Sequence, residues 1–421
     1  MSATPALVVF SHLRWGFVYQ RPQHLMSRLA GRWRVVFVEE PLRSEGPAWL
    51  EEREIAPLLT VLVPHTPVAA PGFHDEQLAL LEPLLEAWMQ QHAIRDGVAW
   101  LYTPMALPLA KTARPSCLAF DCMDELSAFK DAPRQLRQRE NALLKSSALV
   151  IAGGPSLYEA RRGLHPNLEC LPSSVDAAHF SPANLQQGSE HADAVRELQG
   201  GLGAPGAPLL GYFGVIDERL DAELLASLAD AHPDWQIVMV GPVVKIDPHA
   251  LPQHANIHWL GMQAYERLPY FLAGWDVGLM PFALNESTRF ISPTKTLEYM
   301  AGEKPVVSTA IRDVISLYGH AVEVAHDSAA FVRACESVLA EEGAARSRRI
   351  QNMLTTVSVN SWQRSADRVH RLLSEAHQQA HQQANQQAQQ PRPADLPTVS
   401  TRPLPAAPAV QAAAVAGAAA R

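Results

Sequence analysis

The sequence predicts an α/β protein built from two doubly wound parallel sheets. Three observations predict this fold class. Short apolar runs such as residues 35–38 alternate with segments of helical periodicity, which is typical of buried parallel strands. The alternation stops at residue 172, in a segment rich in Gly, Ala, Pro and polar residues, and restarts at Leu209. The length of 421 residues suits two such domains, at about 150 residues each, followed by a tail.

The first domain is predicted over residues 1–175. A helix is expected at residues 23–29, and strands are expected at residues 6–10, 35–38, 59–63, 98–102, 117–120, 148–152 and 168–171. A linker follows at residues 176–207. It contains a G-x-G-x-x-G match at residues 201–206, but this match precedes a strand and includes Pro205. A dinucleotide fingerprint must follow a strand and open a helix, so we interpret the match as accidental.

The second domain is predicted over residues 208–358. Strands are expected at residues 209–213, 236–240, 256–259, 277–281, 305–308 and 322–324, and helices at residues 329–339 and 361–373. The tail, residues 377–421, is rich in Gln, Ala and Pro, without an apolar pattern that could offset the entropy of ordering. We therefore expect it to be disordered.

Composition excludes several function classes. The formal charge of −8 argues against nucleic acid as a partner. Four cysteines without a C-x-x-C pair indicate neither a disulfide framework nor a zinc site. The N-terminus does not have the pattern of a signal peptide, and the sequence contains no apolar run of about 20 residues, so a cytoplasmic location is expected. One helix carries a basic cluster that is either a solvated face or a contact with the inner surface of the membrane: Arg134, Arg137, Arg139 and Lys145.

Residues 292–308 carry the strongest functional pattern. A helix is expected to begin at about Pro293 with Ser292 as its N-cap and to stop at Gly302. Unpaired backbone N–H groups, the hydroxyls of Ser292 and Thr294 and the Lys295 cation would attract phosphate at its open end. Glu298, further along the helix, could accept two hydrogen bonds from a ribose diol. The pattern therefore predicts a nucleotide site.

This stretch resembles the last conserved helix of the retaining GT-B glycosyltransferases usually called family 4, which reads approximately P-x-K-x-x-E-Y-M-A-x-G-x-P-V-V. The matching residues are Pro293, Lys295, Glu298, Tyr299, Met300, Ala301, Pro305, Val306 and Val307. The resemblance covers most of residues 5–375. It implies two facing Rossmann-like domains and a closing helix, here residues 359–376, that returns to the first domain. One departure is Phe290, because the family often has a second glutamate there, eight positions before Glu298.

Other donor-site candidates follow the predicted strands of the second domain. Gly214 permits close approach of a diphosphate, and Arg219 could hold it bidentately. In the resembled family the matching turn carries a basic residue that neutralises the leaving nucleotide. Gly241, Gly261 and Met262 lie in loops at the same sheet edge, where the resemblance implies backbone contacts with the base.

In the first domain, two segments lie at the carboxyl ends of strands, where ligands of such sheets bind. The loop after the first strand supplies His12 as a catalytic candidate, together with four candidates for contacting the acceptor or the donor sugar: Arg14, Trp15, Gly16 and Arg21. Asp121 and Asp124 follow residues 117–120. Asp124 is a candidate general base, and Asp121 could bind a sugar hydroxyl or cap a helix. Their D-x-x-D spacing is not the D-x-D metal motif, and the resembled fold generally works without a metal.

The predicted activity is transfer of a sugar from a nucleotide-diphosphate donor to a carbohydrate or lipid-linked acceptor. The resemblance implies retention at the anomeric carbon, no cofactor, and a role in bacterial surface-polysaccharide assembly. Two alternatives stay open: a sugar-nucleotide epimerase of the same architecture, and a non-catalytic binding protein derived from a transferase.

Overall fold

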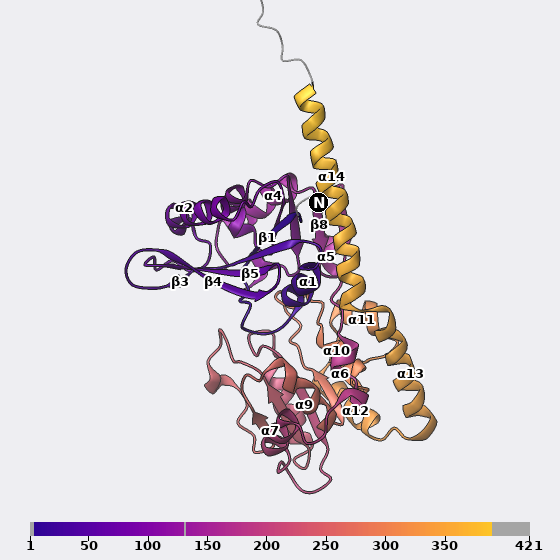
Figure 1. The fold of residues 1–421 in the computed structure, drawn as a ribbon. Helices are drawn as coiled ribbons and strands as arrows, with labels where there is room; N and C mark the ends of the chain where they lie inside the picture. The colour runs from indigo at the N-terminus through magenta and orange to yellow at the C-terminus, as the bar shows by residue number, and fades with distance from the viewer. Residues whose placement is uncertain (1–3, 130–131, 390–421) are drawn as a thin grey trace, which may run out of the picture. The chain divides into compact units, whose positions relative to one another are not determined.

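The computed structural model describes residues 4–129 and 132–389 and contains two sheets that are almost entirely parallel (Figure 1). Within these residues, the first sheet has nine strands in the order β3-β5-β2-β1-β6-β7-β8-β9, with β4 paired to β5. Its strands are β1 (Ala6–Ser11), β2 (Arg34–Glu39), β3 (Leu42–Arg43), β4 (Trp49–Ala56), β5 (Leu59–Thr66), β6 (Val98–Leu101), β7 (Cys117–Cys122), β8 (Leu149–Ala152) and β9 (Leu168–Cys170).

The first sheet is buried on both faces because its apolar side chains alternate between two layers. Leu7 and Val9 of β1 pack in one layer with helices α1 (Arg21–Leu29) and α14 (Trp362–Gln389). Val8 and Phe10 pack in the other layer. That layer includes α2 (Asp75–Gln91), α3 (Leu107–Ala110), α4 (Leu136–Ser146) and α5 (Pro155–Arg161). The C-terminal helix α14 thus covers a face of the first sheet, where the resemblance placed the closing helix.

The β3 and β4 strands were not predicted. β4 pairs antiparallel with β5 at the sheet edge, and most of its residues are exposed. Its centre reads Glu51-Glu52-Arg53-Glu54. A strand held by backbone pairing alone, with charged side chains in solvent, leaves no apolar run to recognise.

The second sheet has the order β12-β11-β10-β13-β14-β15. Its strands are β10 (Leu209–Phe213), β11 (Gln236–Val240), β12 (Ile257–Trp259), β13 (Val277–Met280), β14 (Val306–Thr309) and β15 (Glu323–Ala325). The helices are α8 (Ala222–Ala231), α9 (Leu268–Gly274), α10 (Lys295–Ala301), α11 (Arg312–Tyr318), α12 (Ser328–Leu339) and α13 (Gly343–Val359). The strand order reverses between β10 and β13, and such a switch point opens a crevice at the carboxyl ends of the strands. The two sheets confirm the predicted fold class.

Two connecting segments differ from the prediction. The expected linker, residues 176–207, contains helices α6 (Ala177–Phe180) and α7 (Glu190–Gln199). The Ser189 hydroxyl caps α7 by accepting a hydrogen bond from the Ala192 N–H at 3.2 Å. Helix α14 continues to Gln389, beyond the predicted start of the tail at residue 377. Residues 390–421 of the predicted tail lie outside the described residues.

The described residues up to His381 form one compact unit. In this unit, the first sheet and its helices are the N-terminal lobe, and the second sheet and its helices are the C-terminal lobe. Direct contacts join the lobes. The Asp313 carboxylate of α11 accepts a hydrogen bond from the Ser156 N–H of α5 at 3.0 Å. Tyr19 and Tyr265, one from each lobe, stack with their ring centres 4.7 Å apart. Among the helices of the described residues, none combines the length and hydropathy needed to span a bilayer.

Candidate active site

Three adjoining cavities lie between the lobes. The first cavity, about 620 Å³, is lined by loops of the C-terminal lobe and by residues 15–20 of the N-terminal lobe. The second, about 350 Å³, lies mainly against the N-terminal lobe. A narrow gap of about 100 Å³ adjoins both. Gln20 and Arg219 line all three spaces, so the cavities form one connected site around these two side chains.

Helix α10 begins two residues later than predicted. Its first bonds run from the N–H groups of Leu297 and Glu298 to the Thr294 carbonyl, at 3.1 and 3.4 Å. Ser292 is therefore not the N-cap, because the first accepting carbonyl belongs to Thr294. Ser292 and Pro293 instead stay in the loop that lines the gap, next to Thr294 and Lys295.

Lys295 is a half-buried cation that borders both the gap and the first cavity. Its Nζ lies 5.7 Å from the ring centre of Tyr212, and within the described residues it forms no ion pair or hydrogen bond. Burial lowers the pKa of Lys295, while Glu298 opposes this shift. A buried cation without a partner is costly, so an anionic ligand would relieve this cost.

Gly214 makes room for Lys295. Its φ of +144° belongs to the region that favours glycine, and a Cβ there would lie 1.9 Å from Cε of Lys295. We expect Gly214→Ala to lower the free energy of unfolding by about 1–3 kcal/mol, by straining the backbone and displacing the lysine. Denaturant unfolding would measure this loss.

The matched control is Gly16→Ala, because a Cβ at Gly16 meets nothing within 4 Å and this residue also lines the first cavity. An equal, small effect of both substitutions would contradict the steric role of Gly214.

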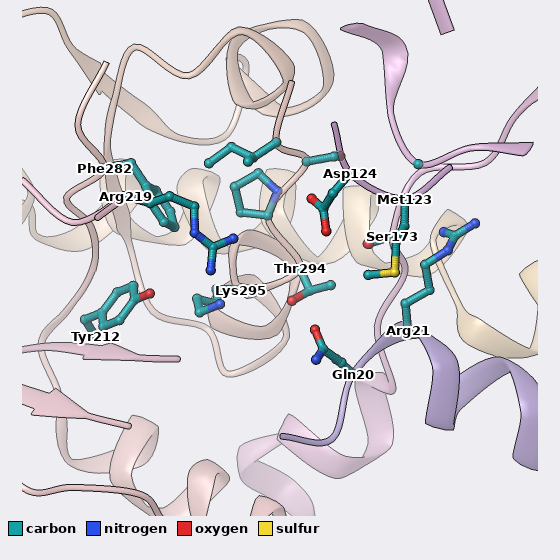
Figure 2. Close-up of a pocket in the computed structure, with 14 residues that line it drawn as sticks. Gln20, Arg21, Met123, Asp124, Ser173, Tyr212, Arg219, Phe282, Thr294 and Lys295 are labelled. Atoms are coloured by element: carbon teal, nitrogen blue, oxygen red, sulfur yellow. The ribbon is translucent and has the colours of Figure 1, made fainter. Parts of the chain in front are cut away.

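Arg219 is held by Asp217, a residue that the sequence did not single out. Nε of Arg219 donates to Oδ1 of Asp217 at 2.9 Å, and Nη2 donates to Oδ2 at 2.6 Å. The guanidinium also lies 5.6 Å from the ring centre of Phe129. In Figure 2, Arg219 and Lys295 point into the same space, with Asp124 and Gln20 on its other side. Two cations thus converge where a diphosphate could lie.

Glu298 lies one turn from Lys295 and lines the first cavity. Its side chain is only 7% exposed and accepts no hydrogen bond from the described residues. Burial raises the pKa of this carboxyl to about 7, against the attraction of Lys295. The Glu298 carboxyl can therefore accept hydrogen bonds from a ligand in the cavity.

The loops after β11 and β12 bring the other donor-site candidates to the same edge. Gly241 and Met262 line the first cavity, whereas Gly261 does not. The Gly241 N–H donates to the Gly261 carbonyl at 2.8 Å, so Gly261 supports the neighbouring loop instead. A Cβ on Gly241 would lie 1.8 Å from the Gly214 carbonyl oxygen, which explains why glycine is needed there.

Asp124 and His12 come from the N-terminal lobe. Asp124 lines the gap and the second cavity, and burial raises the pKa of its carboxyl to about 6 although Arg219 opposes the shift. His12 lines the second cavity, and its buried Nδ1 has no partner among the described residues. Burial and the nearby Lys245 lower the pKa of His12 to about 4. An uncharged imidazole and a carboxyl that titrates near neutrality therefore face one cavity.

Arg21 and Asp121 form a buried ion pair rather than a pair of free ligand contacts. Nε and Nη2 of Arg21 donate to the two carboxylate oxygens of Asp121 at 2.9 and 3.0 Å. Nη1 of Arg21 donates to the Leu171 carbonyl at 2.8 Å. Asp121 lines none of the three cavities. Arg21 does line the gap, but Figure 2 shows its guanidinium pointing away from it. β7 extends to Cys122, two residues beyond its predicted end, so Asp121 belongs to the strand and its carboxylate lies in the interior.

Of the remaining candidates in the loop after β1, two line a cavity and one does not. Trp15 and Gly16 line the first cavity. Arg14 does not: its Nη1 donates to the Glu39 carboxylate at 3.1 Å and to the Glu40 carbonyl at 2.6 Å. Arg14 thus holds the loop against the end of β2.

Sequence reasoning missed several residues that line the site: Tyr19, Gln20, Glu40, Phe129, Asp217, Lys245 and Tyr265. Tyr19 and Gln20 lie in the loop that was singled out, so their position was a usable signal. Asp217 lies two residues before Arg219, in a turn that was also singled out. The other four are single residues in separate loops, and only the fold brings them together. Within the described residues, no three His, Cys, Asp or Glu side chains are grouped so that they could hold a metal ion.

Comparison with known proteins shows which sequences and folds this chain resembles. Residues 209–341 match the model of the family described as "Glycosyl transferases group 1". TuaH of Bacillus subtilis (strain 168), whose name describes a teichuronic acid biosynthesis glycosyltransferase, is 24% identical over 277 residues. That alignment covers 62% of this chain and 69% of TuaH.

Solved structures show the same fold. Sucrose-phosphate synthase from Thermosynechococcus elongatus superposes with a TM-score of 0.65 at 17% identity, over 88% of this chain and 98% of that chain. Anabaena HepE, in complex with UDP and glucose, superposes with a TM-score of 0.64 at 15% identity, over 88% of this chain and 100% of that chain. An E. coli trehalose-6-phosphate structure bound with UDP-2-fluoro glucose superposes with a TM-score of 0.64 at 13% identity, over 89% of this chain and 99% of that chain. Together, these findings confirm the predicted resemblance to GT-B glycosyltransferases.

Proposed function

We propose that this chain, a glycosyltransferase with the GT-B fold, transfers a sugar from a nucleoside-diphosphate donor to a carbohydrate or lipid-linked acceptor. One observation carries the proposal: a cation, Lys295, and a carboxyl, Glu298, lie one helical turn apart in a cavity of about 620 Å³, and neither has a partner among the residues that the structure describes. A nucleoside diphosphate offers phosphate oxygens to the cation and a ribose diol to the carboxyl, at similar spacing.

The donor would extend from the first cavity into the gap. Met262 and the loop after β11 would border the base, and Glu298 the ribose. The diphosphate would lie at Gly214, Arg219 and Lys295, with the sugar beyond it towards Asp124. The sugar would then be next to the second cavity, where the acceptor would bind beside His12.

The chemistry would depend on stabilising the departing nucleoside diphosphate. As the bond between the sugar and the phosphate breaks, negative charge develops on the phosphate, and Lys295 and Arg219 are already oriented towards it. This electrostatic role requires no metal or cofactor. We propose retention at the anomeric carbon from the likeness to family 4, with Asp124 and His12 contacting the donor sugar and the acceptor hydroxyl.

We place the reaction in the assembly of a bacterial surface polysaccharide. Support comes from the name of the relative TuaH, which assigns it to the synthesis of a teichuronic acid. In this proposal the protein acts in the cytoplasm at the inner face of the membrane, where lipid-linked acceptors are available. The exposed side chains of Arg137 and Lys145 on α4 would face the anionic lipids. Arg139 of the predicted basic cluster would not, because it pairs with Asp75 and donates to the Met105 carbonyl.

The ribose assignment predicts a pH dependence. Only the ionised Glu298 carboxylate accepts two hydrogen bonds from a diol, and its pKa is raised to about 7 by burial. Nucleotide affinity should therefore increase as the pH rises from 6 to 8 and level off above. Glu298→Gln should bind about tenfold more weakly at pH 8 and lack this component of the pH dependence. Calorimetric titrations at several pH values would measure both effects.

Glu303→Gln is the matched control, because Glu303 follows the same helix and lines none of the three cavities. Unchanged affinity in Glu298→Gln would falsify the ribose assignment.

The proposed activity is tested in two steps. A thermal-shift panel of UDP-, GDP- and dTDP-sugars identifies the donor, because a ligand that binds only the folded state raises its apparent stability. The donor is then incubated with and without bacterial lipid-linked and oligosaccharide acceptors, and the products are identified by mass spectrometry. A transferase gives a glycosylated acceptor. A new sugar nucleotide formed without acceptor would indicate an epimerase, and binding without turnover would indicate a non-catalytic protein.

A further inference from the structure

Lys245 is an exposed lysine that lines the second cavity and forms no ion pair or hydrogen bond within the described residues. It belongs to the C-terminal lobe, whereas most of the cavity wall comes from the N-terminal lobe. Its Nζ lies 5.3 Å from the ring centre of Phe129, on which Arg219 also packs. Asp217 already compensates the charge of Arg219. Lys245 is therefore the uncompensated cation of this wall.

The backbone around Lys245 is fixed rather than loose. The Val244 N–H donates to the Ile216 carbonyl, and the Ile216 N–H donates to the Pro242 carbonyl, both at 2.9 Å. These bonds join the loop after β11 to the turn that carries Arg219. Lys245 itself has a left-handed backbone, with φ of 63°, which costs energy in a residue with a side chain.

The groups opposite Lys245 favour a ligand that is anionic and partly apolar. His12 is uncharged near neutrality, and burial raises the pKa of Glu40 to about 7 against the attraction of Arg14 and Lys245. Burial raises the pKa of Asp124, on the same cavity, to about 6. Within the described residues, neither carboxyl forms an ion pair with Lys245. Leu13, Phe17, Met105, Leu126 and Leu136 supply apolar surface. A neutral sugar would leave the ammonium of Lys245 without a partner, whereas an anionic group on the acceptor would pair with it.

We propose that Lys245 is a specificity-determining residue that selects an acceptor carrying an anionic group, a carboxylate or a phosphate. This inference rests on the proposed function, because it takes the second cavity as the acceptor site. The anion would lie against Lys245 and Phe129, and the acceptor hydroxyl would point towards His12 and Asp124. Arg219 would stay with Asp217 and the donor diphosphate.

The test uses three sugars of similar size as probes: glucose, glucuronic acid and glucose 6-phosphate. Each is titrated calorimetrically into the full-length protein saturated with the nucleoside diphosphate that it binds. At least one anionic sugar should bind about tenfold more tightly than glucose, the effect of one charge-assisted hydrogen bond. Comparing glucuronic acid with glucose 6-phosphate shows whether the site prefers a carboxylate or a phosphate. Lys245→Met should remove this difference in affinity. Lys111→Met should keep it, because Lys111 is exposed, pairs with Glu82 and lines none of the three cavities.

Anionic sugars that bind no better than glucose, or an advantage that persists in Lys245→Met, would overturn the inference. Nucleotide binding is measured in the same samples, so that a failure of the proposed function can be told apart from a failure of the role proposed for Lys245. If the wild-type protein binds no nucleoside diphosphate, the proposed function is refuted. Intact nucleotide binding without a preference for anionic sugars would refute only the role of Lys245.

Discussion

Replacing Lys295 by methionine should reduce kcat by about 10²–10³-fold, the typical loss when one preorganised group that stabilises developing charge is removed. Lys295 borders the gap in which the leaving diphosphate would gain charge, and it has no protein partner within the described residues. Methionine fills a similar volume without the charge. Single-turnover kinetics with the identified donor would separate this loss from slow product release.

Folding and activity can be separated in this experiment. Burial already lowers the pKa of Lys295, so the loss of its charge should not destabilise the protein. Lys304→Met is the matched control: it lies beyond the other end of α10, where its Nζ donates to the Ala273 carbonyl at 2.9 Å. If kcat stays within about threefold of the wild-type value in Lys295→Met, the lysine does not stabilise the leaving group.

The second large effect should be on stability. Asp121→Ala should lower the free energy of unfolding by about 3–5 kcal/mol, because it leaves the Arg21 guanidinium buried without its counter-ion. Both side chains are almost fully buried, at 2% and 0% exposure. Arg21 also joins the start of α1 to the residue after β9 through its bond to the Leu171 carbonyl, so the loss should affect the whole N-terminal lobe. Chemical denaturation would measure it.

The double variant Arg21→Met/Asp121→Leu removes both charges and should recover most of the lost stability, because neither group is then left unpaired. Asp367→Ala, which breaks the exposed pair with Arg32, should cost less than about 1 kcal/mol. If Asp121→Ala is no more destabilising than Asp367→Ala, the buried pair does not support the fold.

Most strands could be predicted because they are buried on both faces. Residues 209–213 and 236–240 were predicted with the bounds that the structure shows for β10 and β11, since an apolar run between turn residues has few other interpretations. β4 and α7 could not be predicted in this way. The first is a charged edge strand, and the second lies among residues whose composition resembles a linker.

The site was predicted where one segment carries the chemistry. Lys295, Glu298 and Gly214 fall within short motifs, and the structure brings all three to the first cavity. Asp121 shows the limit of this reasoning. A carboxylate at a strand end resembles a ligand contact, but its partner Arg21 lies 100 positions away in the sequence. Phe129 and Lys245 also act through distant neighbours, and such contacts leave no local pattern. Asp217 is different, because its partner Arg219 lies only two residues away.

The central claim is that the cavity between Lys295 and Glu298 holds the nucleoside diphosphate of the donor. A crystal structure of the protein soaked with the nucleoside diphosphate that it binds tests this most directly. The account predicts phosphate oxygens at hydrogen-bonding distance, about 3 Å, from Lys295 and Arg219, and both ribose hydroxyls at the Glu298 carboxylate. A nucleotide bound elsewhere, or one whose ribose faces away from Glu298, would contradict the account.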